Sequence, residues 1–208
     1  MVRDTLATLA SLNAGPLRTH VVLAAHLRPL LVPGGGVRVL ELGSGAGDTA
    51  RALARAGAGS GCRVEVLGVD LSPVAVETAR AGSLPGDGIS FELADALRDG
   101  PDPAEFDLVV SSFLLHHLPG DDAVEALLAR GARARRGFVH LDLARSGAAL
   151  ALFALLGRPL CRRRETYEDG LTSIRRALTR AEAEVLAARG APGARVEVHW
   201  PWRLCISR

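Results

Sequence analysis

Apolar and polar positions along the chain follow two different spacings, and the change from one to the other separates strands from helices. Short, nearly continuous apolar runs bounded by Gly, Pro, Asp or Ser are typical of buried strands. Between these runs, apolar residues recur three and four positions apart, as they do on the packed face of a helix. The apolar runs predict strands over 37–42, 62–70, 89–95, 106–112, 136–144, 194–200 and 203–207.

Helix signals fill the gaps between the predicted strands. The first 31 residues carry helical spacing and end at the breaker "VPGGG". Ser72 followed by Pro73 is a strong helix start. "TRAE", from Thr179 to Glu182, is a capping box. We expect helices at the beginning of the chain and over 48–56, 73–81 and 121–132, with more helices between 147 and 186.

The order of these elements predicts the fold class. Strands and helices alternate through the first five strands, which favours an α/β fold with a parallel sheet and helices on both faces. The last two strands are joined through "PW" and are expected to form an edge hairpin. We interpret residues 1–208 as a single domain with an N-terminal helical cap over 1–31 and a helical insertion over 147–178.

Composition and charge exclude several classes of protein. With 48% apolar and 23% charged residues the chain has a globular composition, and a net charge of +2 does not favour a nucleic-acid partner. Three widely spaced cysteines predict neither a metal site nor a disulfide framework, and they fit a reducing, cytoplasmic setting. The N-terminus lacks a signal-peptide pattern, and the apolar stretch 147–157 is about half the ~20 residues of a membrane span.

The candidate chemistry begins at "LELGSGAGD", where three glycines alternate after the first strand of the predicted sheet. In open α/β sheets, ligands bind beyond the carboxyl ends of the strands, and a glycine-rich first turn lets the backbone approach them closely. Asp70 ends the second strand, where an acid can bind the two hydroxyls of a ribose. At this point NAD and S-adenosylmethionine both fit.

The spacing of the glycines distinguishes these two ligands. The dinucleotide motif is G-x-G-x-x-G/A, and counting from Gly43 its third small residue is replaced by Asp48. An anion there does not suit a pyrophosphate at a helix N-terminus, but it suits a ligand with a cationic centre. A phosphate-binding P-loop is excluded because the chain contains no lysine.

The motifs "VLELGSGAGDTA", "VLGVDLSP", "FELADAL" and "FDLVVSSFLLHHL", in this order, resemble those of class I S-adenosylmethionine-dependent methyltransferases. The resemblance implies a Rossmann-like seven-stranded sheet in the order 3-2-1-4-5-7-6, whose last strand is antiparallel. It implies that the methionine part is held by Glu41, Gly43 and Gly45, the ribose by Asp70, and the adenine by Asp95 with Ala96. Ser44, Leu71 and Ser111 complete the predicted set of cofactor-binding residues.

Two adjacent histidines, His116 and His117, follow the fourth predicted strand and are the candidate catalytic residues. A histidine can take the proton of a hydroxyl acceptor near neutral pH. Neighbouring helical residues point about 100° apart, so only one of the two should face the site. The family resemblance favours His116. Packing and capping by both histidines is the alternative.

The rest of the chain resembles a subgroup similar to quinone-biosynthesis methyltransferases, which in bacteria often accompanies type III polyketide synthases. "DLARS" at 142–146 fits the pattern of this subgroup, whereas Glu168 stands where its histidine is usual. The predicted function is O-methylation of a small, hydrophobic phenolic or polyketide-derived acceptor. C-methylation of a quinol ring and cofactor binding without turnover remain alternatives. "SSFL" replaces the N/D-P-P-Y/F loop of nucleic-acid methyltransferases and argues against that class.

Overall fold

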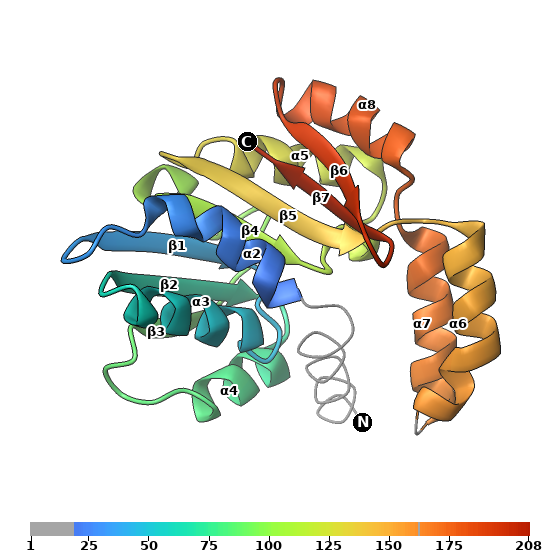
Figure 1. Ribbon diagram of the computed structural model, residues 1–208, viewed down its shortest axis with the longest axis horizontal. Helices are drawn as coiled ribbons and strands as arrows, with labels where there is room; N and C mark the ends of the chain where they lie inside the picture. Colours follow the sequence, from blue (N-terminus) through green and yellow to red (C-terminus); the bar gives the residue numbers. More distant parts are fainter. Residues whose placement is uncertain (1–18, 162) are drawn as a thin grey trace.

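The computed structural model describes residues 19–161 and 163–208, and their central element is one seven-stranded sheet. The strand order is β3-β2-β1-β4-β5-β7-β6, and β7 runs antiparallel to both of its neighbours while the first five strands are parallel. This confirms the predicted sheet and its edge hairpin (Figure 1). The strands are β1 (Gly36–Leu42), β2 (Arg63–Asp70), β3 (Ile89–Leu93), β4 (Leu108–Ser112), β5 (Gly137–Leu143), β6 (Arg195–His199) and β7 (Arg203–Ser207).

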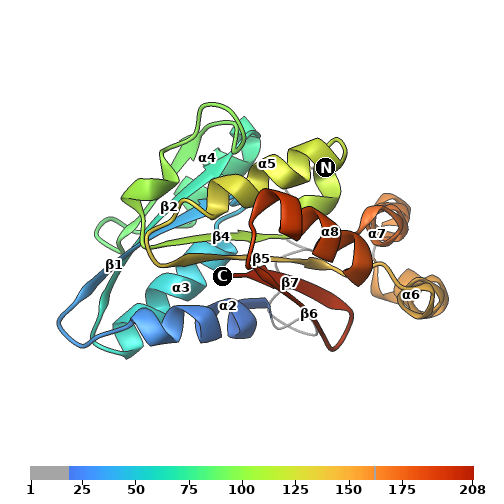
Figure 2. The same cartoon turned by 90° about the horizontal axis from the view of Figure 1, so that it is seen from above.

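Helices cover both faces of the sheet, as the alternating pattern predicts (Figure 2). One buried cluster joins the sheet to α2 (Thr19–Leu27), α3 (Asp48–Gly59) and α4 (Pro73–Ala81). A second cluster on the other face joins it to α5 (Asp121–Gly131) and α8 (Arg180–Gly190). The remaining helical elements are α6 (Gly147–Leu160), α7 (Arg164–Arg176), η1 (Arg28–Leu30), η2 (Pro103–Glu105) and η3 (Leu115–His117).

The predicted helix starts are confirmed by their caps. The Ser72 hydroxyl accepts the Ala75 amide at 3.3 Å at the start of α4. At the start of α8, Thr179 and Glu182 form the reciprocal capping box expected from "TRAE". These side chains satisfy amides that a helix leaves unpaired at its first turn, so the short polar sequences fix where the helices begin.

The predicted insertion over 147–178 consists of two helices, α6 and α7, which lie side by side and project from the edge of the sheet where β5 ends (Figure 1). Phe153 of α6 stacks on Tyr167 of α7 with 5.7 Å between ring centroids, and the Tyr167 hydroxyl donates to the Ala154 carbonyl at 2.9 Å. Of the predicted N-terminal cap, residues 1–18 lie outside the described residues, and the remainder forms α2 and η1.

Candidate active site

The glycine turn between β1 and α3 is held in a conformation that side chains other than glycine rarely adopt. Gly43, Gly45 and Gly47 have φ values of 71°, 53° and 79°. A Cβ atom on Gly43 would lie 2.9 Å from the Leu114 side chain, and one on Gly47 would lie 2.5 Å from the Phe91 ring. The Gly43 and Ser44 amides donate to the Val69 carbonyl at 2.8 and 3.0 Å. The turn is therefore fixed against β2, and its first glycine lies next to the loop that follows β4.

Asp70 connects this turn to the end of β2. Its carboxylate accepts the Gly45 amide at 2.8 Å and the Ser72 amide at 2.9 Å. One side chain thus holds both the glycine turn and the start of α4, while staying partly exposed. Leu71, the next residue, is 71% exposed, an unusual position for a large apolar side chain. Asp70 and Leu71 lie where a nucleoside is predicted to bind.

Glu41 lies beneath the glycine turn with no exposed surface. The Thr49 hydroxyl and the Ala50 amide, in the first turn of α3, are its hydrogen-bonding neighbours. The hydroxyls of Thr49 and Ser112, 3.1 Å apart, join α3 to β4 on the same side of the sheet. Burial raises the pKa of Glu41 to about 8, although the Thr49 hydroxyl and the Ala50 amide oppose part of this shift. The carboxyl group is therefore mostly protonated at neutral pH.

Asp95 does not end a strand, contrary to the prediction, because β3 stops at Leu93. Asp95 begins the following loop instead, where its carboxylate accepts the Leu97 amide at 2.8 Å and its own amide donates to Asp99 at 2.6 Å. Asp and Asn bind nearby backbone amides in this way, which favours a turn over an extended strand. Ala96 is partly buried in the same turn.

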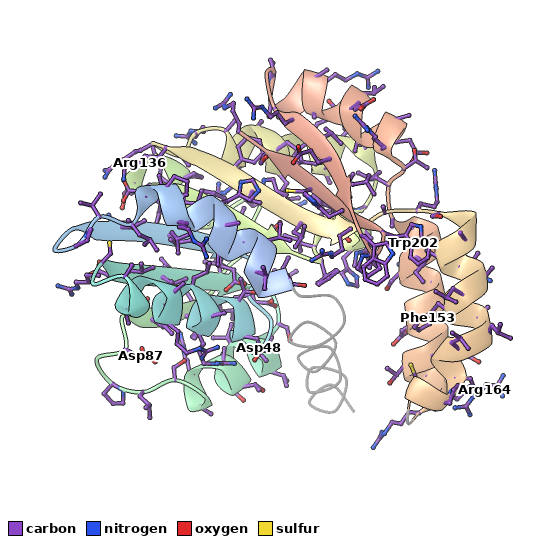
Figure 3. All side chains as sticks on the ribbon, in the orientation of Figure 1. Asp48, Asp87, Arg136, Phe153, Arg164 and Trp202 are labelled. Carbon is purple, nitrogen blue, oxygen red and sulfur yellow. The ribbon has the colours of Figure 1, made fainter. Side chains whose placement is uncertain are left out.

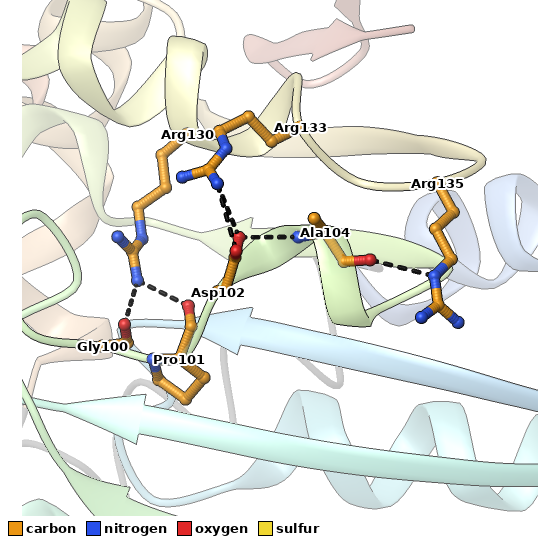
Figure 4. Close-up of polar contacts among 7 residues, drawn as sticks. All are labelled: Gly100, Pro101, Asp102, Ala104, Arg130, Arg133 and Arg135. Atoms are coloured by element: carbon orange, nitrogen blue, oxygen red, sulfur yellow. Dashed lines mark hydrogen bonds and ion pairs between the residues drawn. The ribbon is translucent and has the colours of Figure 1, made fainter.

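The loop that carries Asp95 is anchored from the other face of the sheet (Figure 4). The Arg130 guanidinium on α5 donates to the carbonyls of Gly100 and Pro101 at 2.5 and 2.6 Å. Asp102 caps η2 and pairs with Arg133 at 3.0 Å. These contacts keep the loop near the carboxyl end of β3, where the adenine contacts of Asp95 and Ala96 remain a prediction.

His116 is buried and pairs with an acid that was not among the predicted site residues. Its Nδ1 lies 2.6 Å from the Asp142 carboxylate, and its backbone amide donates to the other oxygen of that carboxylate at 3.1 Å. Both side chains are buried, with exposures of 5% and 1%. Because a carboxylate can only accept hydrogen bonds, Nδ1–H of the imidazole is the donor in this pair. No hydrogen bond within the described residues uses Nε2.

His117 stacks on His116 with ring centroids 4.1 Å apart and is the more exposed of the two. Partial burial lowers the pKa of His117, and electrostatic interaction with the neighbouring His116 ring lowers it further. Arg176 and Asp169 of α7 also act on this ring, so α7 lies beside η3. Of the two histidines, His116 is the one with a carboxylate partner in the described residues, and the expectation that only one of them faces the site stays a prediction.

Ser111 does not present its hydroxyl to the site. It is fully buried and lies 2.8 Å from Nδ1 of His140 in the core. Burial lowers the pKa of His140 to about 3, so this histidine is neutral at physiological pH. Because side chains alternate along a strand, the next residue, Ser112, is the one that faces α3. The Ser111 side chain is thus occupied in the core, and its place among the cofactor-binding residues stays a prediction.

Asp142 is the residue that sequence reasoning missed as a functional side chain. The available signal was an acid inside the apolar run "FVHLDL", since a buried charge needs a partner. The partner, His116, is 26 positions away, and only the parallel pairing of β4 and β5 brings the two together. The residues that the structure describes contain no group of His, Cys, Asp and Glu side chains that could hold a metal ion.

Known proteins resemble this chain both in sequence and in fold. Residues 39–136 match the family model described as a methyltransferase domain. The matched segment begins within β1 and ends just before β5, so it contains the glycine turn, Asp70, Asp95 and His116.

Two curated proteins whose sequences are similar to this chain carry the name ubiquinone biosynthesis O-methyltransferase. The protein from Thiobacillus denitrificans is 34% identical over 128 residues, which are 60% of this chain and 52% of that protein. The protein from Xylella fastidiosa is 32% identical over 145 residues, which are 66% of this chain and 56% of that protein. The chain therefore spans about half the length of the curated relatives it matches.

Solved structures share the fold of this chain at low sequence identity. Human N-acetylserotonin methyltransferase, in complex with S-adenosylmethionine, has a TM-score of 0.66 and 18% identity over 100% of this chain and 56% of its own. Magnesium protoporphyrin IX methyltransferase from Synechocystis, with bound S-adenosylhomocysteine, has a TM-score of 0.63 and 20% identity over 91% of this chain and 81% of its own. Both confirm the Rossmann-like arrangement of the sheet.

Proposed function

We propose that this protein is an S-adenosylmethionine-dependent methyltransferase that methylates an oxygen of a small, hydrophobic phenolic acceptor. The observation that carries the proposal is the His116–Asp142 pair, with 2.6 Å between Nδ1 and the carboxylate. His116 lies in η3, and Leu114, the residue just before η3, contacts the glycine turn. A base with a free Nε2 beside a predicted cofactor turn is the arrangement that deprotonation of a hydroxyl acceptor requires.

The residues around the glycine turn fit the proposed cofactor. Asp70 lies where a ribose can be bound, and Leu71 offers an exposed apolar surface for the adenine. The Glu41 carboxyl group is fully buried, and the Ser44 hydroxyl is a buried polar group without a hydrogen-bond partner in the described residues. When bound, the cofactor supplies a methyl group activated on a sulfonium. The name of the curated relatives and the ligands of the solved structures support the same choice.

In this proposal His116 takes the proton of the acceptor hydroxyl on Nε2, and Asp142 stabilises the imidazolium that forms. The acceptor oxygen gains the methyl group, the former methyl donor leaves as a neutral thioether, and the proton passes from His116 to solvent. Positioning of the acceptor oxygen in line with the methyl group supplies much of the remaining rate acceleration.

The hydrophobic character of the acceptor is supported by the α6–α7 pair, whose helix α7 lies beside η3. Leu152, Leu155 and Leu156 of α6 are 45%, 75% and 49% exposed, and Trp202 lies where the sheet meets these helices (Figure 3). Within the described residues, no helix is long and apolar enough to cross a membrane. A polyketide-derived acceptor, a cytoplasmic setting and the single-domain organisation remain predictions from the sequence.

The proposal is tested by incubating the protein with S-adenosylmethionine and a panel of catechols, alkylresorcinols and quinols. Formation of S-adenosylhomocysteine is measured together with the mass and fragmentation of the product. We expect an O-methyl ether from at least one phenol and loss of turnover in His116→Ala but not in His199→Ala, a matched change on β6. Methylation at ring carbon would replace the O-methylation proposal. Cofactor binding without turnover on any acceptor would refute catalysis.

A further inference from the structure

Two aromatic residues at the rim of the proposed site have a backbone conformation that such residues rarely adopt. Phe113 and Trp202 have φ values of 55° and 47°. In the described part of the chain, the other residues with positive φ are glycines. Glycine adopts this conformation without steric cost, whereas a bulky side chain at positive φ strains the backbone. Strain of this kind is concentrated at functional sites.

Both residues lie at the end of the sheet where the proposed site is. Phe113 directly follows β4, and its amide donates to the Leu141 carbonyl of β5 at 2.8 Å. Trp202 directly precedes β7, and its carbonyl accepts the Ala144 amide, just after β5, at 2.8 Å. Since β5 lies between β4 and β7, the two aromatic residues stand on either side of its carboxyl end. That end also carries Asp142, which holds the proposed base.

The register of the three strands gives the separation of the two aromatic residues. Continued by one residue, the pairing of β4, β5 and β7 places Phe113 level with Asp142 and Trp202 level with Ala144. Strand spacings of about 4.8 Å and steps of about 3.3 Å per residue put the Cα atoms of Phe113 and Trp202 roughly 12 Å apart. Two rings that each contact the same third ring have centroids roughly 9–14 Å apart, since each contact spans about 4.5–7 Å. The separation therefore suits one planar ring between the two side chains.

The hydrophobic core does not account for the two rings. Phe113 is half-buried, yet among the described residues it belongs to neither buried cluster and is not one of the side chains packed on them. The next residue, Leu114, does pack on the second cluster. Trp202 packs on that cluster with part of its surface exposed, and it lies where the sheet meets α6 and α7 (Figure 3). Both residues thus offer apolar ring surface outside the core, at the cost of a strained backbone.

We propose that Phe113 and Trp202 are specificity residues that hold the flat ring of an aromatic acceptor between them, with its hydroxyl toward Nε2 of His116. The inference rests on the proposed function for the phenolic class of the acceptor, and it adds which side chains select the aromatic ring. Stacking and edge contacts between aromatic groups favour a planar ring over a saturated ring of the same size. Phe113 lies three residues before His116, so a ring held beside Phe113 lies near the proposed base.

The test follows acceptor binding through the fluorescence of Trp202. The full chain contains two tryptophans, so Trp200→Phe leaves Trp202 as the fluorescent one. The probes are olivetol, catechol and hydroquinone, titrated with S-adenosylhomocysteine present, and each is compared with the cyclohexanediol of the same substitution. The paired probes share their hydroxyls and differ in the flat ring. We expect a saturable response to at least one phenol, and roughly tenfold weaker binding of its saturated partner.

Replacing Phe113 separates recognition of the acceptor from packing. Phe113→Gly removes the ring and lets the backbone adopt its φ of 55° without strain. In the Trp200→Phe protein it should weaken phenol binding about tenfold, leave the affinity for S-adenosylhomocysteine unchanged and not lower the midpoint of urea unfolding. Phe113→Tyr keeps the ring and should bind the phenol as before. A lower unfolding midpoint in Phe113→Gly would assign the ring to the core and overturn the inference.

Trp202 has a matched control two residues earlier in the chain. Trp200 is 83% exposed, and the same change can be made at both positions. With the phenol that the enzyme methylates, Trp202→Gly should raise KM about tenfold with a smaller effect on kcat, because it removes a contact to the bound ring. Trp200→Gly should leave KM unchanged. Equal KM values in the two variants would overturn the role of Trp202.

The outcomes separate this inference from the proposed function. Preference for a phenol over its saturated partner, lost in Phe113→Gly and kept in Phe113→Tyr, supports the inference. Equal binding of paired probes, unchanged binding in Phe113→Gly, or no response to any of the three phenols would overturn it, and methylation of a phenol would then leave the proposed function standing. Binding of a phenol between the two rings without methylation of any phenol would refute the proposed function alone.

Discussion

Replacing Glu41 by Gln should stabilise the protein, and increasingly so as the pH rises. The pKa of Glu41 is raised from 4.5 to about 8, so the folded protein keeps a proton that the unfolded chain has already released. Where the folded state binds more protons, stability falls with increasing pH. The stability of the wild type begins to fall near pH 4.5 and stops falling near pH 8, because above that pH Glu41 is ionised in the folded and in the unfolded state. Gln is neutral throughout and lacks this slope.

The magnitude follows from the two pKa values. One pH unit within this window corresponds to about 1.4 kcal/mol, so the advantage of Gln should grow by on the order of 4 kcal/mol between pH 5 and pH 8. The assay is urea unfolding of both proteins at four pH values, with Glu105→Gln as the exposed control. A constant difference between the wild type and Glu41→Gln across this range would refute the assignment of Glu41 as a buried acid with a raised pKa.

Three further substitutions test the site and the turn. Asp142→Asn replaces the charged acceptor of the His116 hydrogen bond, which should cost about 1.5–3 kcal/mol. We expect kcat to fall roughly 10- to 100-fold while the affinity for S-adenosylhomocysteine stays the same. An unchanged kcat would contradict the role of the pair. Asp70→Ala removes the acceptor of two turn amides. It should weaken the binding of S-adenosylhomocysteine, measured by calorimetry, at least tenfold. Equal affinity would argue against the placement of Asp70 at the ribose. Gly47→Ala should lower the free energy of unfolding in urea more than Gly86→Ala does. Both glycines have positive φ, which costs alanine about 1–2 kcal/mol at either position, but only at Gly47 would the added Cβ meet a ring, that of Phe91. Equal losses would contradict the crowding at Gly47.

Much of the fold could be predicted because local signals and hydrophobic pattern agreed. Each parallel strand was an apolar run in the sequence, although in β3 only Phe91 is buried. Ser72 and Thr179 fixed the starts of two helices through caps that depend only on neighbouring residues. The glycine turn was equally local, since its positive φ values are a property of the glycines themselves. The order of the strands came from resemblance to a family rather than from the pattern.

The site was less predictable because it depends on pairing between distant segments. Asp142 reaches His116 only through the register of β4 and β5, which the sequence does not encode locally. Ser111 was expected at the site, but one residue along a strand reverses the side chain and places it in the core with His140. Asp95 was placed at a strand end, although its side chain favours the turn that it caps.

Calorimetric titration of the wild-type protein with S-adenosylhomocysteine and, separately, with NADH tests the central claim most directly. Both ligands carry an adenosine that could meet Asp70 and Leu71, but only the first carries the amino-acid tail that the glycine turn and Glu41 are proposed to hold. The account predicts saturable binding of S-adenosylhomocysteine at one site and no binding of NADH. Binding of NADH without binding of S-adenosylhomocysteine would contradict it.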